Sequence, residues 1–141
     1  ILTSSLALSL LRNSASPDES FVLSPFSLNT ALSIVHDGAS GVTQLELTEL
    51  LLNGCYPSDV TNFYSSLAHS ISSTNKSEVT FDSANRFYID DSISLKPDYQ
   101  NHVEEKYKAK VENIDFEKAN FAAATMNAFI EEATNGMIKN I

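Results

Sequence analysis

The segment 21–47 constrains the fold of this chain more than any other, and it reads FVLSPFSLNTALSIVHDGASGVTQLEL. A short apolar run ends at Ser24, a favoured helix N-cap, and Pro25 falls at the first helical position, where its missing N–H costs nothing. Apolar residues then recur at helical spacing up to Gly38, a typical helix stop. They are Leu28, Ala31, Leu32 and Val35. The segment therefore predicts a short strand followed at once by a helix over 25–37.

A second helix follows after a tight turn between two glycines, Gly38 and Gly41. Thr43 with Glu46 three residues later forms a capping box, so the sequence predicts a helix that starts at Thr43 and covers 43–52. The turn itself is not a phosphate-binding loop, because it lacks the further glycine and the Lys-Ser/Thr pair that hold a phosphate.

The remaining sequence predicts more helices and few strands, which is an α+β pattern. Further helices are expected at about 1–12, 57–72, 97–107 and 119–133, and strands at about 20–23, 79–89 and 109–114. The apolar stripe of the helix at 57–72 consists of Val60, Phe63, Tyr64, Leu67 and Ile71. In the strands, Phe87 and Ile89 share one face, and Val111 lies on the face opposite to Lys110 and Glu112. Because so few strands do not make a stable sheet by themselves, we expect an incomplete fold.

The chain is acidic, with a formal net charge of −9 that is spread over both halves. Such a surface repels nucleic acid and anionic membranes, so we expect neither as a partner. No apolar run approaches the roughly 20 residues that span a bilayer. The single cysteine, Cys55, excludes an internal disulfide, which fits a reducing compartment or a secreted protein without disulfides. The cytoplasm and the extracellular space both stay open as locations.

Residues 1–16 have two interpretations. Their apolar start and small residues resemble a signal peptide, but a basic n-region is missing. An amphipathic helix with Leu2, Leu6 and Leu10 on one face accounts for them better. The chain starts inside a helical pattern and stops at Ile141 without a polar tail, so both ends look cut.

Few residues of this chain suit catalysis. Cys55 paired with His36, His69 or His102 would make a thiol nucleophile and hence a hydrolase, but no known motif surrounds this cysteine. The three histidines and the cysteine also lack the spacing of a metal site. We therefore expect no enzyme activity, no catalytic or metal-binding residue and no cofactor.

Three further motifs, in order behind the opening segment, make the chain similar to the serpin family. Residues 83–88, SANRFY, resemble the ANxLF/Y motif of strand 2A, and residues 115–116 resemble the DF pair ahead of helix F. Residues 126–136, MNAFIEEATNG, resemble the INxWVExxTxGKI signature. The resemblance covers the whole chain. It implies that residues 1–141 are the N-terminal portion of a single serpin domain, with helices A to F and strands 6B, 2A and 1A.

The resemblance implies a serine protease inhibitor that works by conformational trapping. In serpins the protease cuts an exposed reactive loop, which inserts as a strand into the large sheet and carries the acylated protease with it. The reactive loop would lie beyond Ile141, so we expect no inhibitory residue in this chain. A serine protease is the expected partner of the complete protein. The alternative is a non-inhibitory serpin, or a serpin fragment, that acts as a protein-binding module.

Three residues match the polar shutter positions that serpins place beneath this sheet: Ser24, Ser27 and Asn127. Small hydroxyls and an amide can re-form hydrogen bonds as strands slide, where a packed apolar layer would resist. The plainer interpretation keeps Ser24 as an N-cap, Ser27 in the first helical turn and Asn127 as an ordinary helix residue. Residues 57–73 hold no Lys or Arg, so we expect no glycosaminoglycan cofactor of the kind that some serpins bind through helix D.

Overall fold

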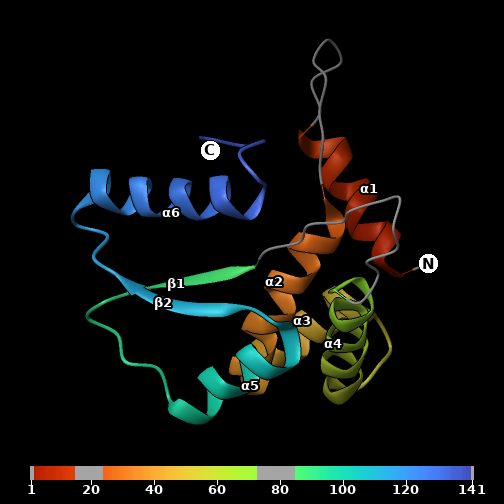
Figure 1. Cartoon of the computed structure of the whole chain (residues 1–141). Coiled ribbons are helices and arrows are strands. Elements are labelled where there is room, and N and C mark those ends of the chain that lie inside the picture. The colour runs from red at the N-terminus through yellow and green to blue at the C-terminus, as the bar shows by residue number, and fades with distance from the viewer. Residues whose placement is uncertain (1, 15–23, 73–84, 141) are drawn as a thin grey trace. The chain divides into compact units, whose positions relative to one another are not determined.

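A computed structural model describes residues 2–14, 24–72 and 85–140, which form helices and a small sheet (Figure 1). In chain order the elements are α1 (Leu2–Ser14), α2 (Pro25–Gly38), α3 (Gly41–Leu52), α4 (Pro57–Ser72), β1 (Arg86–Asp90), α5 (Pro97–Tyr107), β2 (Lys110–Ile114) and α6 (Ala119–Ala133). They belong to two units, residues 1–67 and 68–141, which are described separately below. The helices α4, α5 and α6 have the predicted bounds.

Local signals set both ends of α2. The Ser24 Oγ accepts the backbone N–H of Ser27 at 3.3 Å, so Ser24 is the N-cap that the sequence predicts, with Pro25 directly behind it. The helix ends at Gly38, also as predicted. Both ends of α2 are therefore set by residues next to them in the sequence, without contacts to the rest of the chain.

The start of α3 differs from its prediction. The helix begins at Gly41 rather than Thr43, and its N-cap is Ser40, which makes no capping hydrogen bond through its side chain. Ser40 is extended, and Gly41 takes a φ of +60°, a value that glycine adopts at no steric cost. The chain thus turns into the helix two residues before the predicted capping box, and Thr43 lies in the first turn.

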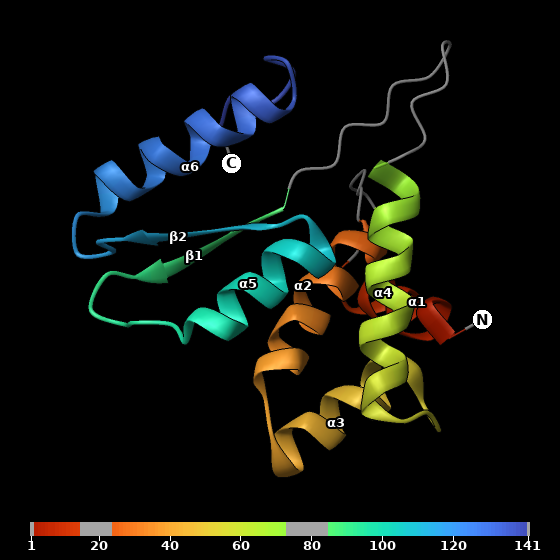
Figure 2. The same ribbon diagram turned by 60° about the horizontal axis from the view of Figure 1, so that its bottom comes forward.

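The core of the first unit lies among its helices (Figure 2). Its buried apolar side chains are Ile34, Leu51, Leu52, Val60 and Tyr64. The Tyr64 hydroxyl donates to the carbonyl of Leu51 at 3.4 Å, which ties α4 to α3, and burial raises the pKa of Tyr64. The apolar stripe predicted for α4 is only partly buried, because Phe63 lies at the surface. Its ring packs edge-on against the buried ring of Tyr64.

The buried face of α2 is mostly polar. Its buried side chains are Asn29, Thr30, Ser33, Ile34 and His36. Of the apolar residues that identify the helix in the sequence, Ala31 and Val35 are exposed. Hydrophobic spacing therefore predicted the helix correctly but did not predict which of its faces is buried. Ser33 can be buried because its Oγ donates to the carbonyl of Thr30 within the same helix, at 2.8 Å.

In the second unit β1 and β2 pair in parallel, with Phe87 opposite Val111. Phe87 and Ile89 share one face of the sheet, as predicted, and the register adds Val111 to that face and places Arg86 and Glu112 on the other. Figures 1 and 2 show α6 along one side of the sheet and α5 on the other. The strand predicted at 20–23 and the first part of the strand predicted at 79–89 lie outside the described residues.

The ends of α5 and α6 are closed by residues with positive φ. Lys108 follows α5 with a φ of 54°, and Gly136 follows α6 with a φ of 78°. The Gly136 N–H donates to the carbonyl of Glu131 at 2.7 Å, which satisfies one of the last carbonyls of α6, so the Asn135-Gly136 pair closes this helix. None of the helices described here has the length and apolar character needed to cross a membrane.

Candidate functional site

Two of the three predicted shutter residues meet at the start of α2. The Ser24 Oγ lies 3.0 Å from the Ser27 Oγ and also accepts the Ser27 N–H. Both serines are exposed. Asn127 lies on α6 in the second unit, where it is partly buried and has interactions of its own. Ser24 and Ser27 therefore form one hydroxyl pair in the first unit, and Asn127 belongs to the second unit.

The serine pair continues into a polar stripe along α2. Side chains three positions apart lie on neighbouring turns of a helix, and every third residue here is polar. The stripe consists of Ser24, Ser27, Thr30, Ser33 and His36. It is exposed at the serine pair and becomes buried from Thr30 onward, to a His36 that is only 1% exposed. Thr30, Ser33 and His36 were not predicted to join the two serines, although the unbroken three-residue spacing of polar residues is visible in the sequence.

Two buried polar atoms, one in this stripe and one next to it, have no hydrogen-bond partner among the described residues. They are the Asn29 Oδ1 and the Thr30 Oγ1. An unsatisfied buried polar group costs about 1–3 kcal/mol, so this part of α2 is stabilised less than its burial alone would give. The buried face of α2 therefore holds two side-chain atoms that are available for hydrogen bonds with other groups.

The deep end of the stripe is connected to two neighbouring helices, to α3 through His36 and to α4 through Asp37. The His36 Nε2 lies 3.0 Å from the Thr48 Oγ1 on α3, and its Nδ1 lies 3.0 Å from the Asp37 Oδ1. The same Asp37 oxygen accepts the Thr61 hydroxyl on α4 at 2.6 Å. The side chains of His36 and Asp37 are 1% and 4% exposed. This buried network therefore connects α2, α3 and α4.

The hydrogen-bond donors of the network can be assigned by counting protons. The Thr48 hydroxyl donates its one proton to the carbonyl of Gln44 at 2.8 Å, so it accepts from the His36 Nε2. The His36 Nδ1 contacts the Asp37 carboxylate, so both ring nitrogens of His36 are engaged within the network.

The network has the connectivity of a nucleophile–histidine–acid relay, but it is structural. In such a relay the hydroxyl must face the substrate and give its proton to histidine. Here Thr48 is buried and gives its proton to the main chain. His36 is fully engaged and does not activate Cys55, which is exposed. Among the residues that the structure describes, no group of three or more metal-ligating side chains gathers.

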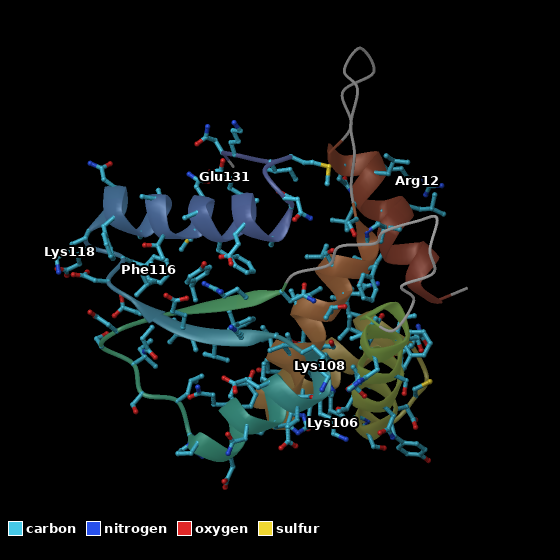
Figure 3. The ribbon with its side chains drawn as sticks, viewed as in Figure 1. Arg12, Lys106, Lys108, Phe116, Lys118 and Glu131 are labelled. Atoms are coloured by element: carbon cyan, nitrogen blue, oxygen red, sulfur yellow. The ribbon has the colours of Figure 1, made fainter. Side chains whose placement is uncertain are left out.

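The second unit places its perturbed carboxylates at the ends of its two strands, where Asp90 is the last residue of β1 and Asp115 follows β2. The Lys118 Nζ lies 2.7 Å from the Asp115 Oδ2, and this hydrogen bond is the main cause that lowers the pKa of Asp115. Figure 3 shows Lys118 and Phe116 together at the turn after β2. Hydrogen bonds from Ser92 lower the pKa of Asp90 in the same way. Both carboxylates are explained by turn geometry, so neither marks a reaction centre.

The described residues form a helix-rich α+β scaffold with a parallel strand pair and a capped serine pair at α2. Comparison with known proteins identifies it. The family described as "Serpin (serine protease inhibitor)" matches residues 2–141, and the chain belongs to that family. The expected serpin fold is thereby confirmed.

Individual relatives agree with this assignment. The chain is 34% identical over 143 residues to Serpin-Z2A of Triticum aestivum and 28% identical over 137 residues to ovalbumin of Meleagris gallopavo. These matches cover 96% and 88% of the chain but 35% and 36% of the relatives. The chain thus spans about a third of the length of the relatives that it matches.

Solved structures share the fold over nearly the whole chain. Arabidopsis AtSerpin1 in its native stressed conformation matches with a TM-score of 0.81 and 28% identity, covering 99% of this chain and 36% of that one. Human thyroxine-binding globulin in complex with thyroxine matches with a TM-score of 0.86 and 25% identity, covering 98% of this chain and 38% of that one. The described structure corresponds to part of a serpin fold.

Proposed function

We propose that the protein that contains this chain is a serpin that inhibits a serine protease by conformational trapping. The observation that carries the proposal is the family match over residues 2–141. Residues 1–141 are then the N-terminal portion of a single serpin domain, and the reactive loop lies outside them. In this proposal the chain supplies the scaffold, and the protease is bound elsewhere.

Two of the matched structures support a scaffold that keeps its form while such a protein changes state. One is the native stressed AtSerpin1, and the other is the cleaved Serpin 42Da, which matches with a TM-score of 0.76 over 98% of this chain. Both forms share the fold of these residues. We infer that the large rearrangement of a trapping inhibitor takes place mainly beyond the helices described here.

Within this function, Ser24, Ser27 and Asn127 are proposed as shutter residues. The 3.0 Å approach of the Ser24 and Ser27 hydroxyls supports this role, because each hydroxyl both donates and accepts and can exchange partners with little cost. The capping bond of Ser24 is a second, structural role of the same side chain. The double variant Ser27→Ala/Asn127→Ala should change the rate of trapping while the N-cap of α2 stays intact.

A second candidate function is binding without inhibition. Ovalbumin and thyroxine-binding globulin are among the similar proteins, and the latter was solved with thyroxine bound. A serpin of this kind would bind a ligand or a partner without trapping a protease. This candidate requires the same scaffold, so the two functions are separated by experiment rather than by the fold.

The test is a titration of trypsin-like and chymotrypsin-like proteases with the full-length protein. Trapping predicts stoichiometric loss of protease activity and a complex that survives denaturing electrophoresis, because the protease stays acylated. Cleavage without a stable complex contradicts the inhibitory proposal and favours the binding module. The isolated 141 residues serve as the control, and we expect them to form no complex with any protease.

A further inference from the structure

The chain contains two Asn-Gly pairs, Asn53-Gly54 in the turn between α3 and α4 and Asn135-Gly136 after α6. In such a pair the main-chain nitrogen of the glycine can attack the amide carbon of the asparagine side chain, because glycine has no Cβ that obstructs the approach. The attack closes a succinimide ring and releases ammonia, and water then opens the ring to aspartate or isoaspartate. The two pairs have the same chemistry, so the structure around each one decides how fast it reacts.

Asn53 and Gly54 are the central residues of an exposed type II turn. Asn53 has a φ of −45° and a ψ of 127°, Gly54 has a φ of 78°, and the Cys55 N–H donates to the carbonyl of Leu52 at 3.0 Å. Nothing lies within 4 Å of the position that a Cβ on Gly54 would take. The Asn53 side chain has no hydrogen-bond partner among the residues that the structure describes. This side chain is therefore free to rotate toward the Gly54 nitrogen.

The two glycine nitrogens differ in how firmly they are held. The Gly136 N–H donates to the carbonyl of Glu131 at 2.7 Å, and this bond must break before the Gly136 nitrogen can attack. The Gly54 N–H faces the carboxylate of Glu49 at 3.5 Å, which is the outer limit of a hydrogen bond, and this contact is exposed to water. The nitrogen in the turn between α3 and α4 is therefore the more available nucleophile.

From these contacts we propose that Asn53 is a site of spontaneous deamidation in the folded protein. The Gly54 nitrogen bonds to the side-chain carbon of Asn53, and the amide nitrogen leaves as ammonia with the proton that Gly54 gives up. Water then opens the ring, so the net change is the loss of ammonia and the gain of water, without any oxidant or reductant. The inference concerns a reaction of this chain and does not depend on whether the complete protein traps a protease.

Deamidation should weaken the junction between α3 and α4. It creates a carboxylate at residue 53, four positions after Glu49, at the end of a helix that has no basic residue in its last turn. Like charges at this spacing repel each other, and a negative charge at a helix C-terminus opposes the helix dipole. The isoaspartate product also lengthens the main chain of the turn by one methylene group. Because Leu52 is buried directly before the turn, these changes act on the core of the first unit.

Peptide mapping by mass spectrometry, after incubation of the full-length protein in mildly alkaline buffer, measures the reaction at both pairs. Each rate is divided by the rate of the same pair in the urea-denatured protein, which removes the influence of the local sequence. This ratio should be about 2- to 10-fold lower for Asn135 than for Asn53, the factor that one main-chain hydrogen bond on the attacking nitrogen supplies. Equal ratios, or a lower ratio for Asn53, overturn the proposal.

Two variants test the consequence for stability. Asn53→Asp supplies one product directly, and Asn53→Gln keeps the amide but closes its larger ring much more slowly. The midpoint of urea unfolding should be about 0.3–0.7 M lower for Asn53→Asp than for Asn53→Gln, and added salt should reduce the difference because it screens the charges. In Asn53→Gln the reaction at residue 53 should stop while Asn135 continues to react. Equal midpoints in low salt contradict the proposed weakening of the junction.

Discussion

The hydroxyl of Thr61 should contribute more to the free energy of unfolding than most single polar groups of the first unit. It donates to the Asp37 Oδ1 at 2.6 Å, and the Asp37 side chain is 4% exposed, so water does not replace the bond when it is lost. Thr61→Val keeps the shape and the helix propensity of the residue while removing this donor. A hydrogen bond to a charged group contributes about 1.5–3 kcal/mol. We therefore expect a loss of about 2 kcal/mol in the free energy of unfolding.

Urea unfolding of the full-length protein, followed by its helical circular dichroism, measures this loss. With a slope of about 2 kcal/mol/M, the midpoint of unfolding should fall by about 1 M. Thr43→Val is the matched control, because Thr43 is exposed on α3 and takes no part in the network. Equal midpoints for the two variants would refute the reasoning, since the buried network would then contribute nothing that an exposed threonine does not.

Three other predictions concern single contacts. Ser24→Ala removes the N-cap of α2 and should lower the free energy of unfolding by about 1 kcal/mol, measured in the same urea assay, and Ser24→Asn should restore most of it. Gly136→Ala forces a Cβ onto a φ of 78° and should cost about 1–2 kcal/mol although the space around it is open, whereas alanine at the exposed Asn120 should cost nothing. Lys118→Ala should return the pKa of Asp115 toward its ordinary 3.8, as read from an NMR titration of its carboxyl carbon. Because folding lowers this pKa, the stabilisation is present above about pH 4 and is lost as pH falls through the lower folded value, and the variant should lack that acid-side loss.

Much of the fold could be predicted because short-range signals set it. Pro25, Pro57 and Pro97 each stand at the first position of a helix, and Gly38 and Gly136 mark two helix ends. Such signals act through the residue's own backbone and its nearest neighbours, so they need no knowledge of tertiary structure. The start of α3 was predicted two residues too late. It also depends on a local feature, because Gly41 takes a positive φ and begins the helix before Thr43, the residue that was expected to cap it.

The buried polar network could not be predicted, because its partners are far apart in the sequence. His36 meets Thr48 twelve positions later, and Asp37 meets Thr61 twenty-four positions later. No periodicity links such residues, and hydrophobic spacing indicated the other side of α2. Ser24 and Ser27 were identified only through their match to the shutter positions of serpins, and their direct contact follows from their spacing of three residues in one helical turn. The cation–π contact between Arg86 of β1 and Phe129 of α6 depends on how α6 lies over the sheet, which no local pattern specifies.

We propose that this chain is part of the scaffold of a serpin that stores conformational strain. The proposal is tested by the unfolding temperature of the full-length protein before and after cleavage by a serine protease, compared with the same protein nicked in an unrelated surface loop. Trapping by strand insertion predicts a large rise on cleavage, because insertion releases the stored strain into a more stable sheet. An unfolding temperature that stays the same or falls after cleavage would contradict the account.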